Sequence, residues 1–423
     1  MRRVYFDNNA TTPVLPEVFE AMQPYFGEHY GNASSIHHHG QETRSAVERA
    51  RESIAALLGC RASEIVFTSG GTEADNLAIF GTVKDGVGRP LFPAIQPKPH
   101  IVTSTIEHHA VLNTCRHLEE QGCEVTYVPV DGRGIIDPAD VKRALRPNTK
   151  LISVMFANNE TGVLQPVAEI GKIAAEADVY FHTDAVQAAG KIPIRVDEIG
   201  CDLLTISGHK LHGPQGVGAL YVRKGTELAP QMYGGRHERS RRAGTENVPG
   251  IVGLGAAAEA ALAGFERRED LKIGELRDRL EEELLRIEAC SVNGASQSPH
   301  PKIAEGAILR LGHPRGSYPA RVPNTTNIRF DGIDGEALVI ALDLKGLAVS
   351  TGAACSSGAI EPSHVLLAMG LTPEQARASI RFSLGKQNTA EDVEFAAGLV
   401  REMVARLREL SPVWGKTATS CKP

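Results

Sequence analysis

The feature that most constrains the fold is an alternation of helical and strand-like patterns between residues 40 and 225. Segments rich in β-branched and apolar residues are separated by amphipathic segments with helical periodicity. In the segment 44–59, one helical face gathers the apolar residues Val47, Ala50, Ile54, Leu57 and Leu58. Gly59 can end this helix. Strands that alternate with helices predict βαβ units and therefore an α/β fold with a mostly parallel sheet covered on both faces.

After residue 225 the pattern changes to long helices and few strands. The predicted elements are one long or broken helix over 253–287, a strand over 324–330, a helix over 335–346 and a terminal helix over 390–410. This pattern of helices and strands predicts a smaller α+β domain. We expect a large domain of residues 15–262, and a small domain made of residues 1–14 together with 263–423.

Charge and cysteine content exclude several classes of protein. The net charge of −6 disfavours a nucleic-acid binder, which usually carries a basic excess. No apolar run is expected to reach the roughly 20 residues of a membrane helix, and the N-terminus lacks the apolar core of a secretory signal. The seven cysteines are scattered and form no C-x-x-C pair. They predict free thiols in a reducing compartment, the cytoplasm, with no metal site.

Polar residues gather where predicted strands end. In "FTSGGTEADN" a strand is followed by a glycine turn and a helix start, so that backbone N–H groups at Gly71 and the hydroxyl of Thr72 can receive an anion. "HTDAVQ" ends another strand with Asp184 and Gln187, and "SGHK" ends the next with Lys210. In parallel sheets ligands bind at the carboxyl ends of the strands, so these side chains predict one binding site.

One ligand, pyridoxal phosphate, would use all of these groups. It has a phosphate, a ring nitrogen that must stay protonated, a phenolic oxygen and an aldehyde that bonds a lysine amine. Asp184 suits the ring nitrogen because a carboxylate favours the charged ring. The residues with matching chemistry are Thr72, Asn159, Asp184, Gln187, Ser207, His209 and Lys210. These surroundings favour a cofactor lysine at position 210 over a solvated surface lysine.

The chain resembles the cysteine desulfurases of the nitrogen-fixation and iron–sulfur-assembly type, within the class V aminotransferases. The resemblance runs nearly end to end. It rests on "VYFDNNATTPV", "YGNASSIHHHG", "FTSGGTEADN", "EHHAV", "ANNETG", "HTDAVQ", "SGHKLHGPQGVGALYV", "RRAGTEN", "NTTNI", "STGAACSSG", "EPSHVLLAMG" and "SIRFSLG". It implies the type I fold of pyridoxal phosphate enzymes, with a seven-stranded sheet in the large domain.

The resemblance also implies a role for each matching residue. Lys210 would bond the cofactor and move the substrate Cα proton, and His108 would stack on the cofactor ring and act as acid or base. Cofactor contacts are expected from Gly71, Thr72, His108, Asn159, Asp184, Gln187, Ser207, His209, Lys210 and Thr245. Thr245 would reach the neighbouring subunit's site in a homodimer. Arg381, with Asn159, would bind the carboxylate of the substrate L-cysteine.

Cys355 would determine the reaction. It lies in "GLAVSTGAACSSGAIEP", a run of small and turn-forming residues without helical or strand periodicity. A flexible exposed loop suits a thiol that takes sulfur from substrate and carries the persulfide to an acceptor. The resemblance implies conversion of L-cysteine to L-alanine, with delivery to an acceptor such as an iron–sulfur scaffold. Stretches 89–99 and 296–323 look longer than usual for the family, so the acceptor stays open.

Three alternatives remain at this point. A selenocysteine lyase would share most of these residues. An aminotransferase, epimerase or other lyase of the same superfamily would keep Lys210 and Asp184 without needing Cys355. A metal-binding protein could use the histidines at 37–39, 108–109, 209 and 212, although their spacing matches no known metal site.

Overall fold

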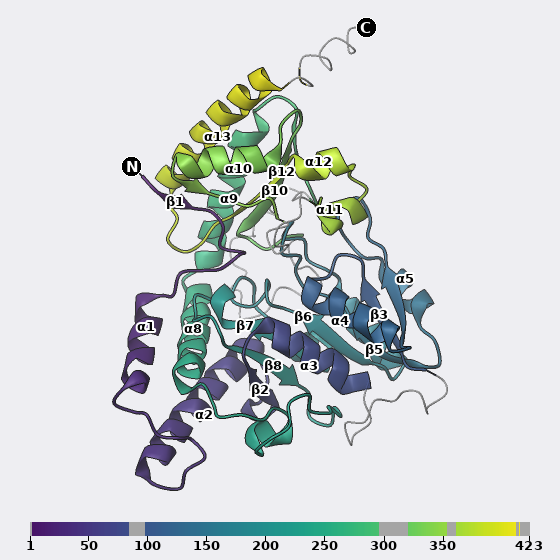
Figure 1. Ribbon diagram of the computed structural model, residues 1–423, viewed down its shortest axis with the longest axis vertical. Coiled ribbons are helices and arrows are strands. Elements are labelled where there is room, and N and C mark those ends of the chain that lie inside the picture. Colours follow the sequence, from purple (N-terminus) through teal and green to yellow (C-terminus); the bar gives the residue numbers. More distant parts are fainter. Residues whose placement is uncertain (1, 84–97, 296–319, 353–360, 412–413, 415–423) are drawn as a thin grey trace, which may run out of the picture.

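A computed structural model of the protein describes residues 2–83, 98–295, 320–352, 361–411 and 414 (Figure 1). Its larger sheet has the strand order β2-β8-β7-β6-β5-β3-β4. The strands are β2 (Ile65–Thr68), β3 (His100–Ser104), β4 (Glu124–Val128), β5 (Thr149–Ser153), β6 (Tyr180–Asp184), β7 (Leu203–Ser207) and β8 (Gly218–Val222). Strands β4, β3, β5, β6 and β7 run parallel, and β8 is antiparallel to both neighbours. The predicted α/β fold with a mostly parallel seven-stranded sheet is confirmed.

Helices cover both faces of this sheet (Figure 1). The helices of this unit are α1 (Pro16–Met22), α2 (His38–Leu58), α3 (Gly71–Val83), α4 (His109–Glu120), α5 (Pro138–Ala144), α6 (Val167–Glu176), α7 (Val196–Ile199) and α8 (Val248–Glu266), with 3₁₀ turns η1 (Gln23–Phe26), η2 (Ala62–Glu64), η3 (Gly208–Lys210) and η4 (His237–Ser240). Alternate strand residues face opposite layers. Val66 packs with α3, whereas Phe67 joins the core with α2 and α8. The predicted helix α2 ends at Gly59, which adopts φ 69°.

A second unit has its own sheets and core. Strand β1 (Val4–Tyr5) pairs in parallel with β11 (Leu347–Ala348), and an antiparallel sheet has the order β12-β10-β9. Its other elements are β9 (Cys290–Val292), β10 (Thr325–Phe330), β12 (Ser379–Ser383), α9 (Glu269–Leu285), α10 (Gly335–Leu344), α11 (His364–Ala368), α12 (Pro373–Arg377) and α13 (Ala390–Leu410). Phe6, Leu280 and Phe382 share one hydrophobic core, so Phe6 packs with this second unit.

The exact domain division stays a prediction. The separate cores support a boundary between residues 1–14 with 263–423 and residues 15–262, but position 262 falls inside α8, which ends at Glu266. The predicted long helix is broken between α8 and α9, where Arg268 adopts φ 57°. A mid-chain residue in this left-handed region cannot continue an α-helix.

Helix α8 corrects one expectation about membranes. It is long and apolar enough to span a membrane by length and composition alone, although no such run was expected. In the fold, 56% of its apolar stretch is buried, and Ile251, Leu254 and Ala258 pack into the core of the larger unit. Helix α8 therefore has the position of a core helix.

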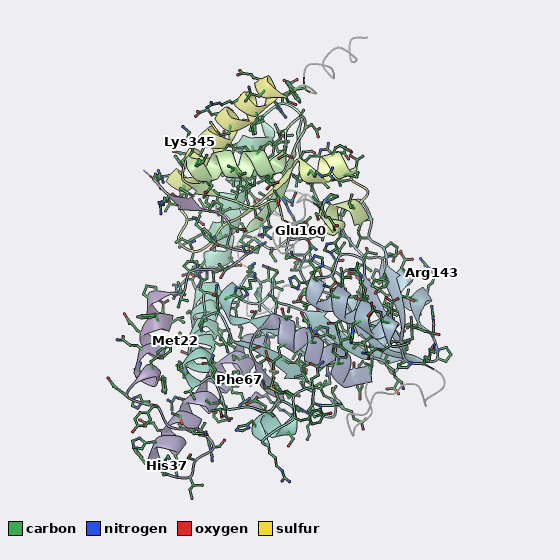
Figure 2. All side chains as sticks on the ribbon, in the orientation of Figure 1. Met22, His37, Phe67, Arg143, Glu160 and Lys345 are labelled. Carbon is green, nitrogen blue, oxygen red and sulfur yellow. The ribbon has the colours of Figure 1, made fainter. Side chains whose placement is uncertain are left out.

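The two units meet at the carboxyl ends of the parallel strands. Figure 2 shows Glu160, which follows β5, between the two bodies of the molecule. Its carbonyl accepts a hydrogen bond of 3.2 Å from the Asn327 amide on β10, and its carboxylate accepts one from the Ser363 hydroxyl. The second unit thus closes over the edge of the sheet where ligands bind in α/β folds.

Candidate active site

Lys210 lies at this edge, in a tight turn directly after β7. The turn requires Gly208, because a Cβ there would lie 2.9 Å from the Pro214 carbonyl oxygen. The Lys210 amine donates to the carbonyl oxygens of Asn9 and Ala10, each at 2.6 Å. The N-terminal segment therefore passes directly over the lysine, about 200 residues away in sequence. Lys210 is half-buried rather than projecting into solvent.

Asp184 ends β6 and lies close to Lys210. Its side chain is 5% exposed, and its Oδ1 accepts a hydrogen bond of 2.9 Å from the Val186 N–H. Burial raises the pKa of Asp184 to about 6, against the opposing effects of the Val186 hydrogen bond and the positive charge of Lys210. The site thus holds a buried carboxyl group within electrostatic reach of an amine.

The glycine turn after β2 meets the ends of β6 and β7. A Cβ on Gly71 would lie 2.9 Å from Val186 and 3.5 Å from the Ser207 Cβ, so only glycine lets these segments approach so closely. Gly70 adopts φ 155°, with nothing within 4 Å of the position of its Cβ. Thr72 is exposed at the start of α3. An anion at this helix N-terminus would find free N–H groups and a favourable dipole.

Contacts of Glu73 connect the glycine turn at Gly70–Thr72 to the loop before α8. Glu73 accepts a 2.7 Å hydrogen bond from the Ser69 N–H and forms an ion pair of 2.8 Å with Arg242. These contacts keep the pKa of Glu73 below its ordinary value despite burial. Thr245, three residues beyond Arg242, is exposed.

His108 caps α4 beside the lysine. Its Nδ1 accepts a hydrogen bond of 3.1 Å from the Ala110 N–H, so the proton of the neutral ring is assigned to Nε2. Burial lowers the pKa of His108 to about 4, and the neighbouring His109 and Lys210 add to this effect. His108 is therefore neutral at pH 7, with one N–H available for donation.

Gln187 and a second lysine, Lys191, contact the same residue, Asn9, as Lys210 does. The Gln187 amide nitrogen donates to the Asn9 carbonyl oxygen at 3.0 Å. The Lys191 amine donates to the Asn9 side-chain oxygen at 2.8 Å and to the Gln187 side-chain oxygen. Burial lowers the pKa of Lys191 well below its ordinary value, and the nearby Lys210 and Arg381 act in the same direction. The Gln187 amide is thus held in one orientation.

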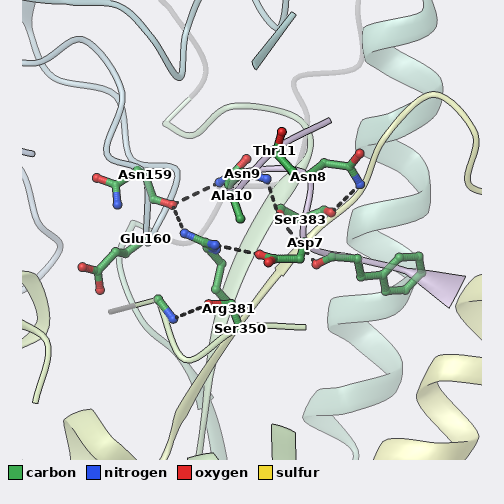
Figure 3. A network of polar contacts seen from close by, with 12 residues as sticks. Asp7, Asn8, Asn9, Ala10, Thr11, Asn159, Glu160, Ser350, Arg381 and Ser383 are labelled. Atoms are coloured by element: carbon green, nitrogen blue, oxygen red, sulfur yellow. Dashed lines mark hydrogen bonds and ion pairs between the residues drawn. The ribbon is translucent and has the colours of Figure 1, made fainter. Parts of the chain in front are cut away.

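Arg381 on β12 reaches the same edge from the second unit (Figure 3). Its guanidinium donates to the Asn159 carbonyl oxygen at 3.0 Å and to the Asp7 carboxylate at 2.7 Å. The side chain is 3% exposed, and its Nε has no hydrogen-bond partner. Asn159 also accepts from the Asn9 amide at 3.1 Å. Arg381 is therefore a buried cation with unused donor capacity.

The remaining expected residues fare differently. His209 lies in the same turn as Lys210, but its Nδ1 contacts the Thr11 hydroxyl at 3.2 Å. Ser207 is buried at the end of β7. Cys355 lies outside the described residues, as do most of the stretches 89–99 and 296–323. In the part of the chain that the structure describes, no three His, Cys, Asp or Glu side chains are grouped to hold a metal ion.

Several residues of the site were not singled out from sequence. They are Asp7, Asn9, Ala10, Asp75, Glu107 and Lys191. The only available signal for the first three was the motif "FDNNATTP", which belongs to the family resemblance. Lys191 resembles any lysine after a helix-like segment, and nothing local in the sequence indicates its burial.

The arrangement fits pyridoxal phosphate. Asp184 is a buried acid placed to face a ring nitrogen, and Lys210 is an amine held at the same edge. The Gly70–Thr72 turn leaves open space at a helix N-terminus, which suits a phosphate. These groups thus match the ring nitrogen, the aldehyde and the phosphate of this cofactor.

Comparisons with known proteins point the same way. The aminotransferase class-V family model matches residues 4–308 and 302–395. A cysteine desulfurase IscS of Dictyoglomus turgidum is 48% identical over 412 residues, covering 97% of each chain. A solved NifS-like protein is 36% identical with a TM-score of 0.82, covering 96% of this chain and 100% of its own. The structure titled SspA in complex with cysteine is 36% identical with a TM-score of 0.74, covering 92% of this chain and 100% of its own.

Proposed function

The chain belongs to the class-V aminotransferase family and, within it, to the cysteine desulfurases; from this premise we propose how its residues divide the work. It is an enzyme that converts L-cysteine to L-alanine and mobilises the sulfur. The family depends on pyridoxal phosphate. When bound, this coenzyme supplies an electron sink for the carbanion that forms at the substrate Cα.

The observation that carries the proposal is the pairing of Lys210 with Asp184 at the carboxyl edge of the sheet. Lys210 would bond the aldehyde carbon of the coenzyme, and Asp184 would face its ring nitrogen. A carboxylate at that position favours a protonated ring. Gln187, whose amide is oriented by Lys191 and Asn9, would donate to the phenolic oxygen.

Two residues would handle protons. The Lys210 amine, once free, removes the proton from the substrate Cα. His108 lies near Lys210 and carries its proton on Nε2. It can therefore donate this proton to a reacting atom and later take it back. Because its pKa is about 4, His108 stays neutral throughout the pH range in which the thiol of Cys355 would react.

Arg381 would bind the substrate carboxylate. Its buried Nε is unpartnered, and the ion pair with Asp7 fixes the plane of the guanidinium. A planar guanidinium binds a carboxylate through two parallel hydrogen bonds. The neighbouring Asn159 would add a polar contact to substrate or coenzyme.

Cys355 would accept the sulfur. Its thiolate would attack the substrate sulfur, the carbon–sulfur bond would break, and the remaining fragment would leave as L-alanine after gaining a proton at Cβ and regaining the proton at Cα. The products are L-alanine and a persulfide on Cys355, so atoms and electrons balance without another oxidant. The five described cysteines are free, and burial raises the pKa of those at 60 and 123 to about 12. Such thiols are poor nucleophiles.

The phosphate site would be completed by a second copy of the chain. Ser207, His209, Gly71 and Thr72 would contact the phosphate from one subunit, and Thr245 from its partner. Large apolar side chains stand exposed on the larger unit: Phe19, Phe26, Tyr30, Ile36, Met232 and Tyr233. A monomer rarely exposes so many large apolar groups without a partner, which supports a homodimer.

The persulfide would pass to an acceptor protein, for example an iron–sulfur scaffold. A cytoplasmic location stays a prediction from the free, scattered cysteines.

The test is mass spectrometry of the protein after incubation with L-cysteine, together with assay of alanine. We expect one added sulfur atom on the peptide that contains Cys355, and alanine formed in equal amount. Cys355→Ala should lose both, whereas the matched control Cys60→Ala should keep both. Sulfur added only at another cysteine, or undiminished alanine formation in Cys355→Ala, would overturn the assignment.

A further inference from the structure

Beneath Asp184, one face of the sheet carries an unusual row of polar residues. His182 and Asp184 are two residues apart on β6, so both side chains point to the same face. In the strand pairing, Asp184 lies opposite Thr205 of β7, and His182 lies opposite Ser153 of β5. Helix α3 packs across these strands. Side chains on a sheet face covered by a helix are usually apolar. The polar side chains of this row must therefore form their hydrogen bonds within the protein.

Asp75 on α3 points into this row. It is 1% exposed, it accepts a hydrogen bond from the Thr205 hydroxyl, and it feels the negative charge of Asp184. Its Oδ1 has no hydrogen-bond partner and lies 3.5 Å from the His182 Nε2. Asp75 is therefore a second buried carboxyl group beside the one that would hold the ring nitrogen.

Glu107, immediately before His108, is a third. It is fully buried, and its Oε1 accepts hydrogen bonds from the Ser104 hydroxyl and from the Met155 N–H at 3.0 Å. Its Oε2 has no hydrogen-bond partner. Asp75 and Asp184 both lie within electrostatic range of Glu107, so the three residues form one carboxyl cluster, a name kept below.

Among the described residues, two of these three groups lack a lysine or arginine as ion-pair partner. Within the described ranges, neither Asp75 nor Glu107 forms an ion pair with a lysine or arginine, and Lys210 is the cation that acts on Asp184. His182 is no substitute, because its Nδ1 contacts the Ser153 hydroxyl at 2.9 Å, its Nε2 contacts Thr205 at 3.1 Å, and burial lowers its pKa to about 3. Cys115, which lies within electrostatic range of Glu107, is a buried thiol.

An unpaired charge is costly in such a place, because desolvation favours the neutral acid and nearby negative charge adds to the effect. The pKa values of the three carboxyl groups agree with this difference in their surroundings. Burial raises the pKa of Glu107 to about 8, and that of Asp75 rises well above its ordinary value. The pKa of Asp184, which the positive charge of Lys210 lowers, rises only to about 6.

We propose that Asp75 and Glu107 stay protonated in the working enzyme, so that the carboxyl cluster carries a single negative charge, located on Asp184. Both act as positioning residues, since they fix the charge state of Asp184 without touching the substrate. The inference rests on the proposed function, in which Asp184 faces the ring nitrogen. One negative charge then matches one protonated ring nitrogen, and the neutral acids fill the space behind it without repelling it.

Infrared spectroscopy of the coenzyme-loaded enzyme tests the charge states directly. Unlabelled enzyme is compared at pH 7 with enzyme labelled with ¹³C in the aspartate or glutamate carboxyl group. We expect carbonyl bands of protonated carboxylic acids that shift on either label, the aspartate band being absent in Asp75→Asn and the glutamate band in Glu107→Gln. If wild-type enzyme shows only ionised carboxylates, the proposal fails, and this wild-type result does not depend on the folding of any variant.

A second readout is the pH midpoint of the visible absorbance of the bound coenzyme. Because an amide replaces a neutral acid, Asp75→Asn and Glu107→Gln should leave this midpoint within about 0.3 units of wild type. Removal of a true charge would move it by about one unit or more, and such a shift in either variant would contradict the proposal. Asp184→Asn is the separate control. If it leaves the coenzyme spectrum unchanged, the proposed function of Asp184 is wrong, while the infrared result still decides the state of Asp75 and Glu107.

Discussion

Asp184 and its neighbours lie deeply buried within one chain, whereas Thr72 of the glycine turn and Gly244 and Thr245 of the loop before α8 are exposed at the rim of the same site. At the buried end, strand register places Asp184 beside Thr205, and helix α3 packs across these strands. At the rim, Thr72 and Thr245 are exposed, and an ion pair between Arg242 and Glu73 joins the two segments. The contrast suggests that residues of a single subunit set the protonation state of the coenzyme ring, and that residues of two subunits complete the phosphate site.

The largest effect is expected at the buried end. Asp184→Asn removes the charge that would keep the ring nitrogen protonated, and loss of a preorganised charge of this kind costs about 10²–10³ in kcat. Alanine formation from L-cysteine and the coenzyme spectrum measure the effect. Asp197→Asn, an exposed carboxylate on α7, is the matched control. A variant at 184 with wild-type kcat would show that this end of the site does not control the chemistry.

Arg381→Lys tests the side of the site that comes from the second unit. Lysine keeps the charge but loses the two-pronged geometry, so KM for L-cysteine should rise about tenfold to a hundredfold, with a smaller change in kcat. Arg329→Lys on the adjacent strand β10 serves as control. An unchanged KM at 381 would remove Arg381 from substrate binding.

Glu107→Gln should change how stability depends on pH. The folded-state pKa is about 8, whereas an unfolded glutamate titrates near 4.3. Between these values the folded protein holds the extra proton, so stability falls as the pH rises from about 5 to 8. The lost stability is on the order of a few kcal/mol.

Thermal unfolding of wild type and Glu107→Gln across this pH range is the measurement. The variant should lose less Tm as the pH rises, while Glu52→Gln, an exposed position on α2, should follow wild type. Parallel curves for all three proteins would mean that Glu107 is not a buried neutral acid.

The smallest effect is expected at the rim. Thr245→Val removes one hydroxyl and should weaken coenzyme binding about fivefold, as expected for one neutral hydrogen bond. If Thr245 serves the partner's site, mixed dimers of Lys210→Ala with Thr245→Val regain one intact site, and that site should bind with wild-type affinity. Mixed dimers in which every competent site keeps the weakened affinity would place Thr245 in its own subunit's site.

The sequence was sufficient to predict several helices and strands and several of the residues at the ends of strands. Periodicity predicted α2 and the stop at Gly59, and Asp184, Ser207 and Lys210 do meet at one edge of the sheet. These predictions succeed because strand ends in a parallel sheet share one edge.

Contacts between distant segments could not be predicted in this way. The carbonyl groups that hold Lys210 come from Asn9 and Ala10, and the carboxylate that holds Arg381 comes from Asp7, 374 residues away. Asp75 looks like a solvated helix residue in the sequence, and only the packing of α3 on the polar face of the sheet reveals its burial.

The most direct test of the whole account is to identify the lysine that bonds the coenzyme. The enzyme loaded with pyridoxal phosphate is reduced with borohydride, digested and analysed by mass spectrometry. The account predicts the reduced adduct on Lys210. An adduct on Lys191, whose buried amine lies at the same Asn9 segment, or no adduct at all, would contradict it.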